Sequence, residues 1–371
     1  MIKVLHVISD TGIGGAGTHL CNLLSCIDRS RFDISVCLPK NSLLIPRLCA
    51  LGIPIIETQH GADRSADPLA IPELMRILRC QKPQILHTHS ALYARLAGLL
   101  CRPPISVNTR HCADTEAKPT TLERLTAGCL ERVLGNHTVA TADYVKDFLP
   151  ARNVPHTRVH IIHNGACPLP AFSEEKNQAL RRELGLSDRH FTVGMVARLA
   201  AGKGHETFIH AASRCIKSSP HIRFLIVGNG ERANALRALV HRLGLDGCVI
   251  FTGFRADVAP IMNILHLNVN CSERSETSSL SLSEGMSLGV VPVVSDCGGN
   301  AYMAGFGENG AVFPVGDAAA LADIVLSLER DRTRLAALSQ RCRNRFERDF
   351  TASGMTRKLE LLYEQLMESK R

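Results

Sequence analysis

The polar stretch from Asn268 to Asn300 holds the side chains best suited to chemistry. Glu276 lies in a predicted loop, and Glu284 lies about one turn into a short predicted helix that ends near Gly289. The first-turn N–H groups of a helix have no partner inside it, and that end carries partial positive charge, so a phosphate group fits there. Carboxylates on both sides of a phosphate suit a sugar nucleotide, because one acid can bind sugar hydroxyls and the other ribose hydroxyls. We therefore expect the backbone of residues 278–280 to bind phosphate.

A structural interpretation of the same stretch stays open. Ser281-Leu282-Ser283-Glu284 fits a capping box, in which Glu284 folds back onto the start of its own helix. A helix that begins at Ser281 would leave only about two turns before Gly289, which is short against the usual range of roughly 8–20 residues.

Two cations flank a glycine-containing turn in the second half of the chain. Arg198 and Lys203 follow the predicted strand Phe191–Val196 and precede a predicted helix. Two cations beside a helix start would neutralise a diphosphate, although two solvated basic residues are the structural alternative. The turn is not a Walker A loop, since G-x-x-x-x-G-K-[ST] is absent. Residues 228–230 and Thr252-Gly253-Phe254-Arg255 follow further strands, where they would surround a base and a ribose.

A glycine loop follows the first predicted strand. Gly12, Gly14 and Gly17 match G-x-G-x-x-G, a pattern that suggests NAD or NADP. A dinucleotide site needs an acid at the end of the second strand, and this strand ends in Pro39-Lys40, where only Lys40 could meet a 2′-phosphate. We favour a loop that lets the backbone approach a ligand's phosphate or sugar. A plain tight turn is the alternative.

Polar residues end two more strands of the first half, as His87-Thr88-His89-Ser90 and Asn108-Thr109-Arg110-His111. In open α/β sheets the carboxyl ends of the strands form the ligand crevice. Arg110 and His111 are therefore placed to contact bound groups. A structural role is the alternative for His111 and the favoured interpretation of His87 and His89.

Strands and helices alternate twice along the chain, which predicts parallel α/β sheets. A polar, proline-bearing stretch of residues 166–177 separates the halves, so we expect domains at residues 1–170 and 171–345 and a final helix within 346–371. The predicted strands are Ile2–Ile8, Ile34–Leu38, Ile53–Glu57, Ile85–His87, a strand that contains Val107, Thr138–Ala142, Val159–Ile162, Phe191–Val196, Phe224–Val227, Val249–Phe251, a strand that runs into Asn270, and Val290–Ser295. The predicted helices are Thr18–Cys26, Ala70–Arg79, Ala91–Leu100, Leu122–Leu134, Gln178–Leu184, His205–Ile216, Arg232–Leu243, Ala318–Leu328, Leu335–Phe346 and Met355–Met367.

The composition excludes several classes of protein. The 371 residues are 45% hydrophobic and 21% charged, with no run of about 18 apolar residues that would cross a membrane. The 14 cysteines are scattered without C-x-x-C spacing, so we expect free thiols in a reducing cytosol. The net charge of +8 favours anionic partners such as sugar nucleotides or phospholipid head groups. Aromatic residues are only 4%, so a nucleic-acid stacking surface is not expected.

The order of these motifs resembles the retaining glycosyltransferases of the large glycogen-synthase-like family, which transfer sugars from sugar nucleotides. The matching motifs are GGAGTHL near the start, HNG at 163–165, ARLAAGKG at 197–204, VGNGE at 227–231, FTGFRADV at 251–258, SERSETSSLSLSEGMSLGVVPVVSD, and FPVGDAAALA at 313–322. The resemblance covers nearly the whole chain. It implies the α/β GT-B fold: two Rossmann-like parallel-sheet domains facing across a cleft, with a final helix that crosses back to the N-terminal domain.

The resemblance also assigns roles. Arg198 and Lys203 would hold the donor diphosphate, Glu284 the ribose, and Glu276 the hydroxyls of the transferred sugar, while His111 would lie near the reacting sugar. The expected donor-binding residues are Gly15, Arg198, Lys203, Arg255, Ser279, Leu280 and Glu284, and the expected catalytic residues are Glu276 and His111.

The expected function is transfer of a hexosyl unit, with retention, from a nucleotide sugar to a saccharide or lipid-linked acceptor in bacterial cell-surface glycan synthesis. A UDP-sugar is the expected donor, and it is a substrate, so no cofactor is expected. No Asp-x-Asp occurs, which predicts metal independence, and we expect a cytoplasmic protein that can touch the anionic membrane face. Residues 298–302 lack the acid common in the family, and Thr-Ser-Ser follows Glu276 where Phe-Gly is common. These departures motivate one alternative, a non-catalytic GT-B binding protein; an NADP-dependent oxidoreductase is the other.

Overall fold

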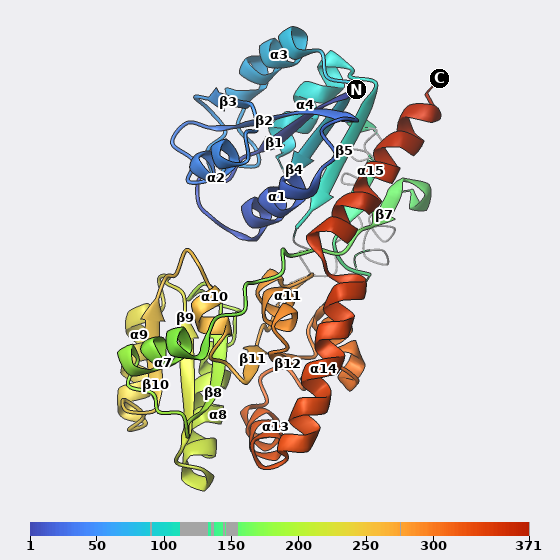
Figure 1. The fold of residues 1–371 in the computed structure, drawn as a ribbon. Helices are drawn as coiled ribbons and strands as arrows, with labels where there is room; N and C mark the ends of the chain where they lie inside the picture. Colours follow the sequence, from blue (N-terminus) through green and yellow to red (C-terminus); the bar gives the residue numbers. More distant parts are fainter. Residues whose placement is uncertain are drawn as a thin grey trace. The chain divides into compact units, whose positions relative to one another are not determined.

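The computed structural model describes residues 1–89, 91–111, 133–134, 137–143, 145, 155–274 and 276–370 (Figure 1). The chain divides into two compact units. Unit 1 comprises Met1–Ala166 and Ala352–Arg371, and unit 2 comprises Cys167–Thr351. The C-terminal residues thus belong to the unit in which the chain begins.

Unit 1 is built on a parallel seven-stranded sheet in the order β3-β2-β1-β4-β5-β6-β7. Its strands are β1 (Ile2–Ile8), β2 (Phe32–Pro39), β3 (Ile55–Thr58), β4 (Ile85–His89), β5 (Ile105–Arg110), β6 (His137–Ala140) and β7 (Val159–Ile161). Its described α-helices are α1 (Gly15–Cys26), α2 (Ile45–Ala50), α3 (Ala70–Gln81), α4 (Leu92–Cys101) and α15 (Ala352–Glu368). Strand β1 lies between β2 and β4, so the winding of the sheet reverses beside β1.

The apolar run of β1 is explained by helices on both faces of the sheet. Val4 and Ile8 pack into one cluster with α1 and α15, whereas Leu5 and Val7 pack into another with α3 and α4. Alternate strand residues point to opposite faces, so a strand covered on both faces is apolar at nearly every position. The last helix is held on α1 by this packing and by the hydrogen bond from Thr356 Oγ1 to the Leu23 carbonyl (3.2 Å).

Unit 2 repeats the architecture with a parallel six-stranded sheet in the order β10-β9-β8-β11-β12-β13. Its strands are β8 (Phe191–Val196), β9 (Ile222–Val227), β10 (Val249–Gly253), β11 (Leu267–Asn270), β12 (Val291–Ser295) and β13 (Ala311–Phe313). Its α-helices are α7 (Glu174–Glu183), α8 (His205–Ser218), α9 (Ala233–Arg242), α10 (Ala259–Met262), α11 (Leu280–Ser287), α12 (Asn300–Met303), α13 (Ala318–Arg330) and α14 (Arg332–Asp349). Here the winding reverses beside β8, which lies between β9 and β11.

The structure confirms two α/β halves with parallel sheets and most of the predicted elements. Helix α1 begins at Gly15 rather than at Thr18, because the glycine loop itself enters the helix. The short elements α2, α10, α12 and β13 were not predicted, since three to six residues carry too little periodicity. The predicted helix Leu122–Leu134 falls outside the described residues except at 133–134.

Two expectations from composition can be compared with the described part of the chain. Every cysteine there is a free thiol, as predicted. Among the described helices, none has the length and apolarity needed to cross a bilayer.

Candidate functional site

The loops after β8 and β11 meet where the winding of the unit 2 sheet reverses, which is where open α/β sheets bind ligands. Gly202 and Gly204 take positive φ angles of 79° and 72° in the loop after β8. A Cβ on Gly204 would lie 2.0 Å from the carbonyl oxygen of Cys271, so only glycine allows this approach. The Glu273 N–H donates to the Gly202 carbonyl (2.8 Å) and joins the two loops. Lys203 is therefore fixed beside the loop that carries Glu276.

Glu276 is a buried carboxylate held by one cation and two neutral donors. Its Oε2 accepts hydrogen bonds from Lys203 Nζ (2.8 Å), Ser272 Oγ (2.7 Å) and Asn270 Nδ2 (3.3 Å), and its side chain is only 12% exposed. Burial by itself would raise the pKa of the Glu276 carboxyl, but Lys203 and the two other donors hold that pKa below its ordinary value. All three of these bonds end on Oε2, which leaves Oε1 for the hydroxyl groups of a ligand.

A second layer of polar groups supports this carboxylate. Asn300, at the start of α12, is fully buried, and its Nδ2 donates to Asn270 Oδ1 (3.4 Å) and Ser295 Oγ (3.3 Å). Ser295 Oγ in turn donates to the carbonyl of Ser272 (2.6 Å). Sequence reasoning missed the roles of these residues. The only available signal was a polar last residue in each of β11 and β12 and a polar residue after the Gly298-Gly299 pair.

Helix α11 begins at Leu280, two residues after Ser278. Ser279 is its N-cap residue, and the N–H groups of Leu280, Ser281 and Leu282 form its first turn. The capping-box interpretation is therefore wrong, because Ser281 lies inside the helix and is not the N-cap. Glu284 lies half-buried further along α11, on the helix whose N-terminus points its N–H groups towards the carboxyl edge of the sheet.

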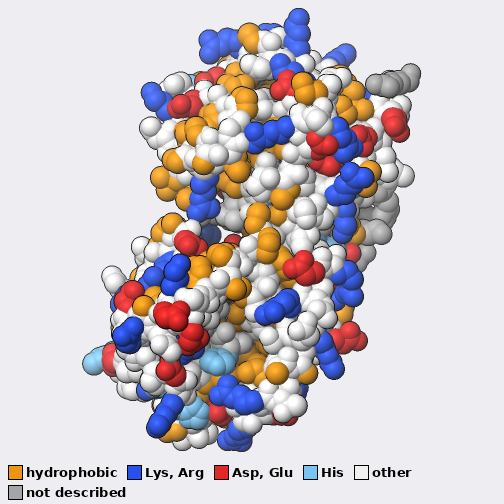
Figure 2. Space-filling view, viewed as in Figure 1, with side chains coloured by type: hydrophobic (Ala, Val, Ile, Leu, Met, Phe, Trp, Pro, Cys, Tyr) orange, Lys and Arg blue, Asp and Glu red, His pale blue; other side chains and the backbone are white. Residues whose placement is uncertain are grey.

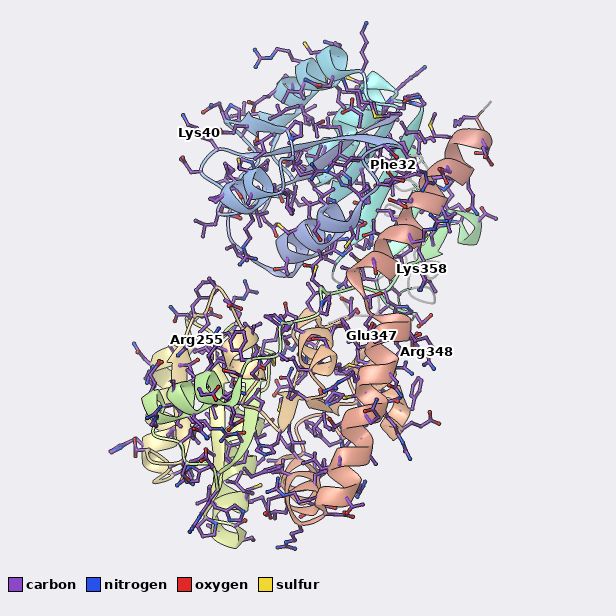
Figure 3. All side chains as sticks on the ribbon, viewed as in Figure 1. Phe32, Lys40, Arg255, Glu347, Arg348 and Lys358 are labelled. Atoms are coloured by element: carbon purple, nitrogen blue, oxygen red, sulfur yellow. The ribbon has the colours of Figure 1, made fainter. Side chains whose placement is uncertain are left out.

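The other two cations of the predicted site are Arg198 and Arg255, and their surroundings differ from those of Lys203. Arg198 follows β8 and is exposed. Arg255 follows β10, and its guanidinium pairs with Glu183 on α7 (3.3 Å; Arg255 is labelled in Figure 3). The structure thus brings Lys203 and Glu276 into contact but gives Arg255 a partner on a different element.

We expect Gly204→Ala to destabilise unit 2 by more than about 3 kcal/mol, because the new methyl group would combine a strained φ with the clash against Cys271. Gly185→Ala is the matched control, since Gly185 has a similar φ of 67° but nothing within 4 Å of its Cβ position. That control should cost only about 1–2 kcal/mol. Urea unfolding of both variants measures the difference, and equal losses would contradict the packing argument.

In unit 1 the predicted residues also follow strands at the carboxyl edge. Gly15 is the first residue of α1 and is exposed, and His111 follows β5. His19, further along α1, lies with its ring 4.8 Å from that of His111, and its Nδ1 is 2.9 Å from Asn164 Oδ1. This contact joins the GGAGTHL and HNG motifs, which are far apart in the sequence.

Five histidines of unit 1 converge beside these residues: His6, His19, His87, His89 and His111. Two sets of three place one ring nitrogen each within 4.8 Å of the others, a spacing that could hold a metal ion. His87, however, already uses both nitrogens, with Thr109 Oγ1 (2.7 Å) and the Tyr363 hydroxyl. The sequence signal for the cluster was the H-x-H pattern of His87 and His89 at the end of β4, whereas His6 lies within an apolar run.

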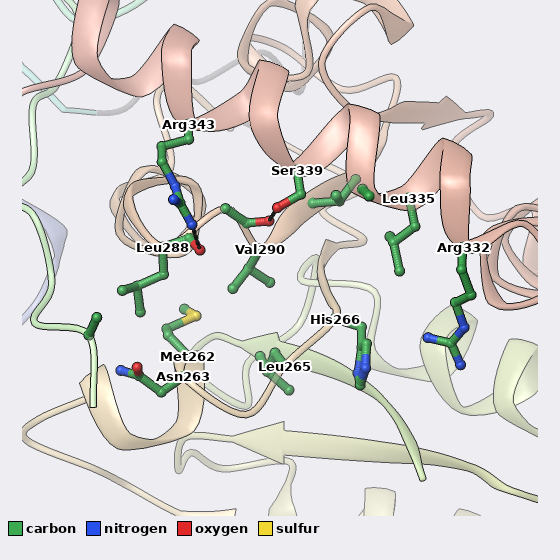
Figure 4. Close-up of a pocket in the computed structure, with 14 residues that line it drawn as sticks. Met262, Asn263, Leu265, His266, Leu288, Val290, Arg332, Leu335, Ser339 and Arg343 are labelled. Atoms are coloured by element: carbon green, nitrogen blue, oxygen red, sulfur yellow. Dashed lines mark hydrogen bonds between the residues drawn. The ribbon is translucent and has the colours of Figure 1, made fainter. Parts of the chain in front are cut away.

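A separate cavity of about 350 Å³ lies at the opposite edge of the unit 2 sheet (Figure 4). His266 and Val290, which directly precede β11 and β12, line it together with Arg332 and Arg343. The guanidinium of Arg343 donates to the Leu288 carbonyl (2.8 Å). None of the predicted site residues lines this cavity, so it is distinct from the site around Glu276.

Two doubly wound sheets with polar loops at their winding reversals define a two-unit nucleotide-binding type of fold. Solved structures share it. The crystal structure of Anabaena HepE in complex with UDP-glucose has a TM-score of 0.84 at 20% identity and covers 98% of this chain and 100% of its own. WaaG, a glycosyltransferase involved in lipopolysaccharide biosynthesis, has a TM-score of 0.72 at 15% identity and covers 96% and 98%.

Sequence comparisons give the family. The model of glycosyl transferases group 1 matches residues 176–345, and that of glycosyltransferase family 4 matches residues 13–167. The chain belongs to the group 1 glycosyltransferases of the GT-B fold. A curated relative from Escherichia coli, UDP-Gal:alpha-D-GlcNAc-diphosphoundecaprenol alpha-1,3-galactosyltransferase, is 25% identical over 398 residues, which span 100% of this chain and 98% of the relative. Alpha-monoglucosyldiacylglycerol synthase of Streptococcus pneumoniae is 22% identical over 68% of this chain and 60% of its own length. Neither the oxidoreductase nor the non-catalytic alternative receives support from these matches.

Proposed function

We propose that this glycosyltransferase moves a hexosyl unit, with retention and without a metal ion, from a UDP-sugar to a saccharide or lipid-linked acceptor of a bacterial surface glycan. The observation that carries the proposal is the Lys203–Glu276 pair (2.8 Å) next to the start of α11. It puts a cation, helix N–H donors and a fixed carboxylate at one edge of a nucleotide-binding sheet. A nucleotide sugar needs all three, for its diphosphate and its sugar hydroxyls.

Each candidate residue has a chemical role in this proposal. Lys203 and Arg198 bind the diphosphate together with the N–H groups of Ser279 and Leu280. Glu276 accepts hydrogen bonds from the transferred sugar through Oε1, and Glu284 accepts them from the ribose. Arg255 contacts the donor only if its pairing with Glu183 is broken, so it is the weakest member of the set. In unit 1, Gly15 contacts the donor phosphate and His111 lies near the reacting sugar in this proposal, the roles that the family resemblance implied.

The reaction proceeds by cleavage of the bond between the anomeric carbon and the diphosphate oxygen. The electron pair goes to the diphosphate, the sugar becomes oxocarbenium-like, and the acceptor oxygen bonds the anomeric carbon from the face of the leaving group. The acceptor's proton passes to a diphosphate oxygen. The positive charges of Lys203, Arg198 and the α11 N-terminus stabilise the leaving group. Lys203 and the helix N-terminus are already held in place, so their contribution needs little reorganisation during the reaction.

The names of two relatives support the proposed donor, acceptor and stereochemistry. The Escherichia coli relative is named for UDP-Gal, a diphosphoundecaprenol acceptor and an alpha-1,3 linkage, and the Streptococcus relative is named for an alpha-glucosylated diacylglycerol. Common UDP-hexoses are themselves α-linked, so an α product implies retention. For this chain, a lipid-linked acceptor would place the protein at the cytoplasmic membrane face. The net charge of +8 favours that contact, although Figure 2 shows Lys and Arg interspersed with acidic residues on the face it presents.

A thermal-shift screen with UDP-, GDP-, ADP- and dTDP-sugars tests the donor. We expect a UDP-sugar at about 100 times its Kd to stabilise the protein by about 2.7 kcal/mol, a rise of several degrees in Tm, with EDTA present. The shift should be lost in Lys203→Met and kept in Lys217→Met, a control at the exposed far end of α8. Equal shifts with all four nucleotides, or a shift that requires a divalent cation, would overturn the donor or the metal assignment. The NMR coupling of the product's anomeric proton then reports retention.

A further inference from the structure

Three histidines of unit 1, which we call the three-histidine set, converge where β4 and β5 end. They are His19 of α1, His89 at the end of β4 and His111 after β5, and one ring nitrogen of each lies within 4.8 Å of the other two. His89 Nδ1 lies 3.0 Å from His111 Nε2, and the centres of the His19 and His111 rings are 4.8 Å apart. A tetrahedral zinc ion with nitrogen ligands at about 2.0–2.1 Å holds those nitrogens about 3.3 Å from one another. The three rings therefore need only small rotations to share one ion.

The other possible set among the described residues fits an ion less well. It consists of His6, His87 and His89, which are all buried. His87 already uses both of its ring nitrogens, because one lies 2.7 Å from Thr109 Oγ1 and the other contacts the Tyr363 hydroxyl. It would have to give up one of these partners to bind a metal. The three-histidine set is therefore the better candidate.

Two rings of the three-histidine set are oriented by a further partner, as metal-bound histidines usually are. His19 Nδ1 lies 2.9 Å from Asn164 Oδ1. An amide oxygen only accepts, so Nδ1 donates and His19 Nε2 carries the lone pair. His89 Nε2 lies 3.1 Å from His6 Nδ1, which can accept its N–H, and His89 Nδ1 then faces His111 with a lone pair. A cation takes the place of the proton between His89 and His111, so the fit holds whichever of the two rings carries that proton.

The three-histidine set offers neutral nitrogen ligands and a way in. Burial lowers the pKa of His19 to about 4 and the pKa values of His89 and His111 well below the usual value, so all three rings are neutral at pH 7. Neutral imidazole is the form that binds zinc, copper or nickel, and three protein ligands leave a fourth position open. His19 and His89 are at most 3% exposed, whereas His111 is only partly buried, so an ion would enter on the His111 side.

We propose that the three-histidine set binds a divalent transition-metal ion such as Zn²⁺, and that this ion inhibits sugar transfer. The binding step rests on the geometry of unit 1 alone. The inhibition rests on the proposed function, in which His111 lies near the reacting sugar, because an ion held by His111 would occupy the space of that sugar. Transfer itself needs no metal in the proposed function, so the ion acts as a reversible inhibitor and not as a cofactor.

Zinc binding is measured by titration calorimetry of the full chain after treatment with EDTA, removal of the EDTA and alkylation of accessible thiols. We expect one Zn²⁺ per chain, and X-ray absorption at the zinc edge should show nitrogen at about 2.0–2.1 Å and no sulfur at about 2.3 Å. Loss of an outer partner typically weakens metal binding about 10–100-fold, so Asn164→Ala should fall in that range, and His19→Gln, which lacks a ligand, should lose more. His160→Gln, which alters the separate His137–His160 pair of the same sheet, should bind zinc as the unchanged protein does. No binding, sulfur ligands, or equally tight binding by His19→Gln would overturn the proposal.

Transfer assays test the inhibition. Zn²⁺ that saturates the site should stop transfer, EDTA should restore it, and Mg²⁺, which prefers oxygen ligands, should not inhibit. Asn164→Ala should need about 10–100 times more Zn²⁺ for the same inhibition, and this variant still reports if His19→Gln fails to fold. Zinc binding with undiminished transfer would overturn the inhibitory role. Absence of transfer from any donor by the metal-free protein would refute the proposed function and leave the binding result standing.

Discussion

Replacing Lys203 with methionine is expected to lower kcat/KM for sugar transfer by roughly 10²–10³-fold, the usual loss when one fixed donor is removed from developing negative charge. The ammonium group serves two partners. It would neutralise the leaving diphosphate, and it already pairs with Glu276 at 2.8 Å. Without it, the Glu276 carboxylate would remain buried with only two neutral donors, and its pKa would rise.

The double variant distinguishes a shared role from two separate ones. Glu276→Gln should lose activity to a similar extent, and Lys203→Met combined with Glu276→Gln should be little worse than the worse single variant, because the two groups act as a unit. Steady-state kinetics with a UDP-sugar, alongside the exposed Lys217→Met control, measures all four proteins. Activity within a few-fold of the unchanged protein in either single variant would remove the pair from the mechanism.

Mild acid is expected to unfold unit 1. Four of its histidines are at most 3% exposed: His6, His19, His87 and His89. Burial, with neighbouring histidine charge for His6, lowers the pKa of His6 to about 3 and that of His19 to about 4, and those of His87 and His89 fall well below the usual value. Below pH 6.5 the unfolded chain therefore binds protons that the folded unit does not, so stability falls as the pH drops from 6.5 towards 4.

The expected loss is large against the whole stability of a domain. At pH 5.5 each such histidine costs about 1 kcal/mol relative to neutral pH, so the four together cost several kcal/mol, compared with a typical total of about 5–15 kcal/mol. Unfolding followed by calorimetry at pH 8.0 and 5.5, with hydrogen exchange to locate the opening unit, measures the loss. His6→Leu should reduce the loss by about 1 kcal/mol, whereas changing His241, whose side chain is 82% exposed, should not. Equal stability at the two pH values would show that the histidines are charged or hydrated in the fold.

The sequence predicted the elements better than the contacts between them. Apolar runs and glycine turns are local signals, so β1 and β8 were predicted with their observed bounds. Capping is also local: Asp317, directly before the predicted helix Ala318–Leu328, accepts from the N–H groups of Ala319 and Ala320. The pairing of Lys203 with Glu276 depends on β8 lying next to β11, a fact of sheet order that no local pattern carries. Lys203 and Glu276 could each be predicted as part of a site, but their direct contact could not.

The failures have physical reasons of the same kind. His6 lies in a strand that is covered on both faces of the sheet. Such a strand does not alternate between apolar and polar residues, so no pattern in the sequence indicates which way His6 points. The capping-box prediction failed because α11 starts at Leu280, two residues earlier than a helix capped by Ser281 would start. Arg255 was placed after β10 correctly, but its partner Glu183 lies on α7, 72 residues earlier in the sequence.

The return of the last helix to unit 1 has a consequence for biosynthesis. Residues 352–371 are made after unit 2, yet the α1 face of unit 1 stays uncovered until α15 reaches it. Unit 2 has its whole sequence by residue 351 and can fold first, although it is made second. A nascent chain stalled before Ala352 should thus expose the apolar side of α1 to chaperones, and a premature stop codon just before Ala352 would harm the unit that was translated first.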